Sequence, residues 1–198
     1  MAELMLGVLA EDLNDCDVID TLVGRIFAER QIPAGRYKVH KRGSQGCAKL
    51  RRKAEPWMRE LATRGCRHII LVHDRDRHDE AQLRAQLSAL AVPGGVERHV
   101  CIPVEEIEAW FFASSKALEL ICREDAARHV HSSPHLIRSP KEKLKELSLG
   151  ANRKPRHSEN DNAKLAEVLE LDACARRCAA FRELRSFLHQ LAQRIGPG

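Results

Sequence analysis

The sequence predicts an α/β fold in which a parallel sheet of about four strands is flanked by helices. Short apolar runs alternate along the chain with longer segments whose apolar residues recur at helical spacing. One run, Ile69–Val72, follows a break at Gly65, which is typical of a strand buried on both faces. Strands that alternate with helices form parallel sheets through right-handed crossovers. The last third of the chain shows only helical patterns.

Three strands are expected in the first part of the chain. The first is an apolar run, and the helix after it is indicated by apolar residues at i, i+3 and i+4 spacing. Pro56 should start a new helix or kink the one that contains it. In order, the elements are strand Leu4–Ala10, helix Asp17–Arg30, a short strand at Arg36–His40, helical segments over Cys47–Arg64, and strand Arg67–Val72.

The second part of the chain should add one strand and several helices. Pro93-Gly94-Gly95 marks a turn. We expect residues 1–125 to form the core domain and residues 126–198 a helical extension packed on it. The elements are helix Glu80–Ala91, strand Val96–Ile102, and helices Glu105–Cys122, Pro140–Leu147, Ala163–Leu169 and Ala173–Ile195.

Acidic residues follow two of the expected strands. Glu11 ends the first strand and Asp15 begins the next helix, while Asp74 and Asp76 follow Ile69–Val72. The carboxyl ends of parallel strands meet at the edge where open α/β sheets bind ligands. Carboxylates gathered there repel each other unless a cation lies between them, and hard divalent ions take such oxygen ligands. Alternatively, Asp15 caps the first helix and Asp76 or Asp79 caps the later one.

The order of these acids resembles a known family. Glu-x-x-x-Asp after a first strand, followed by Asp-x-Asp after a later strand, is similar to the Toprim domain of topoisomerases, bacterial primases and OLD-type nucleases. The segment Ile102–Trp110 (IPVEEIEAW) resembles the Glu-x-Glu-x-Trp segment that follows a proline in small stand-alone Toprim proteins related to the OLD nucleases. Many Toprim domains have Gly directly after the first Glu, where this chain has Asp12. That departure disfavours the primase and topoisomerase branches.

The tail also resembles that group, so the similarity covers nearly the whole chain. The matching residues are Pro140-Lys141-Glu142-Lys143-Leu144, Lys154 near His157, Asp172 and Phe181. In OLD-like enzymes, a lysine downstream of the acids offsets charge on the scissile phosphate. The resemblance implies this role for Lys154 as first choice and for Lys141 as second.

The resemblance implies a metal-dependent nuclease that uses one or two Mg²⁺ or Mn²⁺ ions. Glu11, Asp74 and Asp76 would hold an ion, and Glu11 is alternatively the general base. Asp15 would bind the ion through water or complete a second site. Glu106 and Glu108 are further candidates for that second site, with Glu108 preferred.

Basic residues concentrate in two blocks, although the net charge is only +5. Lys and Arg bind the phosphate backbone of nucleic acids. The alternative is that both blocks are ordinary solvated helix faces. The residues expected to contact nucleic acid are Lys38, Lys41, Arg42, Arg51, Arg52, Lys143 and Arg153.

The sequence lacks a Gly-x-x-x-x-Gly-Lys-Ser/Thr loop for ATP. OLD-like relatives commonly work with an ATPase module, so we expect an ATPase partner encoded separately and a role in defence against phage or other foreign DNA. A non-catalytic nucleic-acid-binding or assembly subunit remains an alternative, as does an RNA-processing Toprim enzyme. A homo-oligomer is left open.

The chain is expected to be cytoplasmic and not to cross a membrane. No window approaches the roughly 20 apolar residues of a membrane span, and the N-terminus has no secretion signal. The seven cysteines are odd in number and form no Cys-x-x-Cys pair. These features favour a reduced chain in the cytosol.

Overall fold

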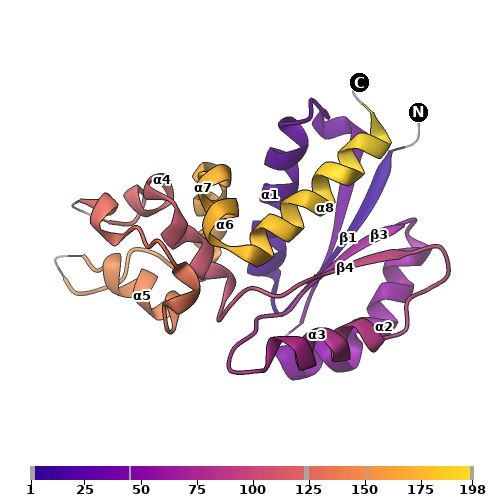
Figure 1. Ribbon diagram of the computed structural model, residues 1–198, viewed down its shortest axis with the longest axis horizontal. Coiled ribbons are helices and arrows are strands. Elements are labelled where there is room, and N and C mark those ends of the chain that lie inside the picture. The colour runs from indigo at the N-terminus through magenta and orange to yellow at the C-terminus, as the bar shows by residue number, and fades with distance from the viewer. Residues whose placement is uncertain (1–2, 45, 123–124, 151, 197–198) are drawn as a thin grey trace.

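A computed structural model describes residues 3–44, 46–122, 125–150 and 152–196 and shows a four-stranded sheet between helices (Figure 1). The strand order is β2-β1-β3-β4, and every neighbouring pair is parallel. The predicted fold class of an α/β protein with about four parallel strands is therefore confirmed. The strands are β1 (Leu4–Ala10), β2 (Tyr37–Gly43), β3 (His68–Val72) and β4 (Glu97–Cys101).

Helices cover both faces of the sheet. α1 (Leu13–Ala28) and α8 (Ala179–Ile195) lie on one face, while α2 (Cys47–Thr63) and α3 (Glu80–Ala89) lie on the other (Figure 1). Successive residues of β3 alternate between two hydrophobic clusters: Ile70 and Val72 join the first, and Ile69 and Leu71 join the second. Because both faces are buried, the strand reads as an uninterrupted apolar run.

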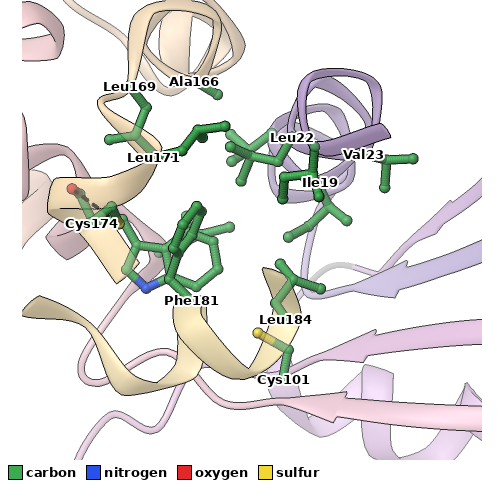
Figure 2. Packing of buried hydrophobic residues seen from close by; sticks show 14 of the residues in the cluster. Ile19, Leu22, Val23, Cys101, Ala166, Leu169, Leu171, Cys174, Phe181 and Leu184 are labelled. Atoms are coloured by element: carbon green, nitrogen blue, oxygen red, sulfur yellow. Dashed lines mark hydrogen bonds between the residues drawn. The ribbon is translucent and has the colours of Figure 1, made fainter. Parts of the chain in front are cut away.

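The larger cluster joins the two ends of the chain. Figure 2 shows Phe181 and Leu184 of α8 beside Ile19 and Leu22 of α1, with Cys101 of β4 close by. Residues on both sides of the expected division at 125/126 thus share one core. The shorter elements form a lobe beside the carboxyl ends of the strands (Figure 1). Its helices are α4 (Ser115–Glu119), α5 (Pro140–Leu147), α6 (Asn162–Val168) and α7 (Leu171–Arg177).

Short 3₁₀ helices complete the lobe and the sheet connections. They span Ala34–Arg36, Ile107–Ala113, Ala126–His129, Pro134–Leu136 and Glu159–Asp161. Among the residues that the structure describes, no helix is long and apolar enough to cross a membrane.

The first helix begins at Leu13 and not at Asp17 as expected, and two other expected helices are each broken in two. The helix expected over Glu105–Cys122 is a 3₁₀ helix followed by α4, because Ser114 is extended and its hydroxyl accepts a hydrogen bond from the Ala117 N–H. A serine hydroxyl used in this way starts a new helix. The helix expected over Ala173–Ile195 is likewise broken at the extended residue Cys178, giving α7 and α8.

Pro56 lies inside α2 and starts no new helix. It is exposed, so water can satisfy the carbonyl whose hydrogen bond a proline removes.

The chain leaves β1 and β3 toward opposite faces of the sheet. α1 follows β1 and packs in the first cluster, whereas α3 follows β3 and packs in the second, although β1 and β3 are neighbours. Such a divergence is a topological switch point, and it opens the crevice in which α/β proteins bind ligands. Glu11 directly follows β1, and Asp74 lies two residues after the end of β3.

Gly43, the last residue of β2, lies against the turn that follows β1. A Cβ atom at Gly43 would lie 2.5 Å from the backbone nitrogen of Leu13 and 2.6 Å from the carbonyl carbon of Asp12. The next residue, Ser44, donates its hydroxyl to the Glu11 carbonyl at 3.0 Å. This close approach fixes the backbone of the turn that carries Glu11 and Asp12.

We expect Gly43→Ala to lower the free energy of unfolding by about 2 kcal/mol or more, because the added methyl group meets backbone atoms and not a movable side chain. Urea denaturation measures this change. Gly35→Ala is the matched control, because no atom lies within 4 Å of its Cβ position. Equal stabilities of the two variants would contradict the close-approach argument.

Candidate metal centre

Carboxylates from three parts of the chain gather at the switch point. Glu11 follows β1, Asp15 lies in the first turn of α1, Asp74 follows β3, and Glu108 lies in the 3₁₀ helix after β4. The Asp74 N–H donates to Oε1 of Glu11 at 3.1 Å, which links the ends of the two strands directly. The pKa of Asp74 is raised first by burial and then by the charges of Asp15, Glu11 and Glu108. The charge of Glu106 also raises this pKa, so five of the six predicted metal ligands interact electrostatically at this edge of the sheet.

Asp12, and not Asp15, caps α1. The Asp15 N–H donates to Oδ1 of Asp12 at 2.9 Å. Asp79 caps α3 in the same way, accepting from the Gln82 N–H at 2.8 Å. The capping alternative is thus wrong for Asp15, and of the Asp76/Asp79 pair it is Asp79 that caps.

Asp15 is buried. Its side chain is only 7 % exposed, and burial, followed by the charges of Asp12, Glu108 and Glu11, raises its pKa to about 8. Since Asp12 caps the helix, the buried carboxyl of Asp15 is not explained by capping.

Glu11 is held by its neighbours and is partly buried. Burial is the main reason why its pKa rises to about 7. Nδ1 of His73 lies 2.7 Å from the Asp74 carbonyl oxygen and 3.3 Å from Oε1 of Glu11. Because the Asp74 carbonyl oxygen is an acceptor, the imidazole donates from Nδ1, and burial lowers the pKa of His73. His73 thus packs against Glu11 and Asp74, a position that the sequence motifs did not reveal.

Asp74 carries the least satisfied oxygen of the group. Its Oδ1 is buried and has no hydrogen-bond partner among the residues that the structure describes. A buried carboxylate oxygen without a partner costs free energy unless it is protonated or bound to a cation.

Asp76 differs from its neighbour Asp74. It is exposed, with a positive φ of 49°, and its charge raises the pKa of Glu11. It therefore lies at the rim of the acidic group.

Glu106 and Glu108 have different surroundings. Oε2 of Glu106 accepts the Lys141 N–H at 2.9 Å, at the start of α5, so that oxygen has a structural contact. Glu108 is only 3 % exposed, and its Oε1 accepts from Nδ2 of Asn162 at 3.0 Å. The arrangement supports the preference for Glu108. Asn162 was missed, because no motif marks an asparagine that lies 54 residues after its partner.

The two candidate lysines have different surroundings. The charge of Lys141 lowers the pKa values of Glu11, Asp15 and Glu108. Burial lowers the pKa of Lys141 itself, but Glu108, Glu159 and Glu106 outweigh that effect and raise it. Lys154 is exposed and forms no ion pair with the residues described in the structure; its N–H binds Oδ1 of Asn152. Lys141, and not Lys154, accompanies the acids.

Several residues expected to bind nucleic acid are paired within the protein. Lys41 contacts Asp17 at 2.8 Å and Asp20 at 2.9 Å, and Arg42 pairs with Glu60. Lys143 pairs with Glu146 on the same helix. Lys38, Arg52 and Arg153 are exposed, and Arg51 is close enough to His73 for its charge to lower the pKa of that ring.

The donor set is chemically suited to a hard divalent cation, because every candidate ligand is a carboxylate oxygen. The unpartnered Oδ1 of Asp74 lies among them. Within residues 3–44, 46–122, 125–150 and 152–196, no three His, Cys, Asp or Glu side chains form a ready metal-binding group. A cation would therefore need to draw these side chains closer together.

No protein-family model matches the chain, and neither a curated protein nor a solved structure matches it significantly.

The raised pKa values predict how stability depends on pH. Glu11 and Asp15 keep their protons up to about pH 7 and 8 in the folded protein, but release them near pH 4 when unfolded. Below about pH 4, both groups are protonated in the folded and the unfolded chain. In EDTA, the free energy of unfolding should therefore fall as the pH rises from about 4 to about 8, by at most about 1.4 kcal/mol per pH unit for each group.

Urea denaturation at pH 5 and pH 8 measures this loss. Mn²⁺ should restore more stability at pH 8, where the carboxylates are ionised, and Asp15→Asn should flatten the pH dependence. An equal effect of Mn²⁺ at both pH values would contradict the prediction.

Proposed function

We propose that this chain is a Mg²⁺- or Mn²⁺-dependent nuclease that cleaves phosphodiester bonds in DNA. The observation that supports it most is the unpartnered, buried Oδ1 of Asp74, which lies among the carboxylates of Glu11, Asp15 and Glu108 at the switch point of the sheet. A buried acidic group of this kind is stabilised by a divalent cation, and Lys141 adds a positive charge beside it. The order of the acids, similar to that of Toprim domains, agrees with this chemistry.

Each residue has a separate part in the proposed reaction. Glu11, Asp74 and Glu108 would hold the cation, with Asp15 beside them. When bound, the cation would supply Lewis-acid stabilisation of the phosphate and lower the pKa of water. Alternatively, Glu11 would leave the cation to the other acids and act as the general base, since its pKa of about 7 suits proton transfer near neutral pH. Lys141 would face the scissile phosphate and offset the charge that develops on it.

The wider setting of the proposal rests on the OLD-like resemblance. It includes an ATPase partner encoded separately, a cytoplasmic location and a role in defence against foreign DNA. Lys38, Arg52 and Arg153 are exposed, and the structure gives them no carboxylate partner among the residues it describes. Arg52 and Arg153 would therefore be free to meet a phosphate backbone, whereas Lys38 lies near the amino end of β2, away from the acids.

Glu11→Gln tests the proposal. It keeps the shape of the side chain and removes its charge. Folding should remain nearly intact, because the change relieves repulsion within the acidic group. Cleavage of plasmid DNA with Mg²⁺ or Mn²⁺ should fall by roughly two orders of magnitude or more, the scale for loss of a general base.

The matched control is Glu119→Gln, an exposed acid outside the site, which should cut like the wild type. The assay is run on DNA and on RNA, with and without the ATPase partner. Equal cleavage by Glu11→Gln and the wild type would place the site elsewhere. Cleavage of RNA alone would favour the RNA-processing alternative, and no cleavage at all would favour the binding subunit.

The two lysines give a paired prediction. Lys141→Ala should lower the cleavage rate at saturating DNA by at least roughly tenfold, because its charge acts on the reacting group. Lys154→Ala should change the rate little, because the Lys154 side chain is exposed and forms no ion pair among the described residues. Single-turnover kinetics with measured DNA affinity separates the two effects. A loss confined to DNA affinity in Lys141→Ala would remove its catalytic role.

A further inference from the structure

A hollow lies beside the acidic group and is lined by none of its carboxylates. It has a volume of about 360 Å³ and lies between the residue after Asp74, the 3₁₀ helix Ile107–Ala113 and the first turn of α8. Its wall is apolar and includes Val104, Ala109, Trp110 and Ala180. Its size lies at the lower end of the range for pockets that bind small molecules.

Three arginines surround this apolar wall: Arg75, Arg177 and Arg182. The hollow has one acid, Glu80, and that carboxylate is already 3.1 Å from Nη2 of Arg84. The hollow therefore carries an excess of positive charge.

Backbone carbonyls, and not carboxylates, hold two of these arginines in place. Nη1 of Arg177 donates to the Ala113 carbonyl at 2.6 Å, and Nη1 of Arg182 donates to the Ala175 carbonyl at 3.1 Å. In the described part of the chain, neither forms an ion pair. Arg75 lies 3.7 Å from Glu105, and its Nε is buried without a hydrogen-bond partner there. The guanidinium groups thus keep donors available to an anion.

The first turn of α8 adds to this positive potential. α8 is 17 residues long, and Cys178, its N-cap residue, makes no side-chain cap hydrogen bond. Ala179 and Ala180 of this turn line the hollow. Free N–H groups and the positive end of the helix dipole favour an anion at such a position.

We propose that this hollow binds the phosphate monoester of a nucleotide. The phosphate lies at the start of α8 between Arg177 and Arg182, whose planar donors suit its oxygens. The nucleoside lies against the apolar wall formed by Val104 and Trp110, which inorganic phosphate alone would leave uncovered. Two sources share this chemistry: a free nucleotide, or the terminal nucleotide of a strand. The proposal goes beyond the nuclease activity and requires no metal.

Calorimetry of the full chain in EDTA tests the proposal with the four nucleoside 5′-monophosphates. At least one should bind saturably at one site, and the matching nucleoside and inorganic phosphate should bind at least tenfold more weakly. Arg177→Gln/Arg182→Gln should weaken binding at least tenfold. Arg176→Gln, a neighbour on α7 outside the hollow, is the control that should bind as the wild type does.

Ala179→Glu separates binding from folding. A carboxylate in the first turn of a helix interacts favourably with the positive end of the helix dipole, so this variant should fold normally. Its carboxylate would nevertheless repel the phosphate, and binding should again fall at least tenfold. Glu11→Gln should bind like the wild type, so failure of the nuclease proposal would leave this result unchanged.

Competition between the bound monophosphate and a short oligonucleotide shows whether the hollow takes a free nucleotide or the end of a strand. Displacement by the 5′-phosphorylated form but not by the 5′-hydroxyl form supports the end of a strand, and displacement by neither supports a free nucleotide. Absence of saturable binding by every monophosphate would overturn the proposal. So would wild-type affinity in Ala179→Glu.

Discussion

Repulsion among buried carboxylates at the ends of β1 and β3 is the constraint on which the candidate site depends. Asp74 lies within reach of the charges of Asp15, Glu11 and Glu108, and burial strengthens each of these interactions. Such a group disfavours folding unless protons or a cation compensate for it. The sheet tolerates it because its two hydrophobic clusters, one on each face, stabilise the strands independently of the site. Because β1 and β3 are hydrogen-bonded neighbours, the backbone positions of Glu11 and Asp74 cannot move apart.

The C-terminal third completes the site as well as the core. Lys141 lies in the first turn of α5 and Asn162 begins α6. These residues supply a positive charge that acts on Glu108 and an amide that donates to it. α8 returns to the sheet and packs beside α1. Residues 1–125 alone would therefore expose one face of α1 and leave Glu108 without its partners. Residues 126–198 thus pack on residues 1–125 through a shared hydrophobic cluster.

The strands and the acidic ends of β1 and β3 could be predicted because each depends on local sequence: an apolar run, a break and a following acid. Residues 107–113 were harder, because all seven are buried and show no exposed face from which a helical period could be read. Lys141 and Lys154 have the same chemistry, and only tertiary packing distinguishes them. His73 and Asn162 were missed for a related reason: their roles arise from contacts between distant segments, and their residue types have many other uses.

Binding of Mn²⁺ tests the central claim most directly, because it requires neither a substrate nor a partner. Calorimetry at pH 8 should show saturable binding to the wild-type chain and to the exposed-acid control Glu119→Gln. Asp74→Asn removes the charge of the ligand whose Oδ1 is buried without a hydrogen-bond partner among the described residues, and should weaken the affinity at least roughly tenfold, a loss of about 1.4 kcal/mol. Equal affinity in Asp74→Asn and the wild type would contradict a metal centre at the switch point.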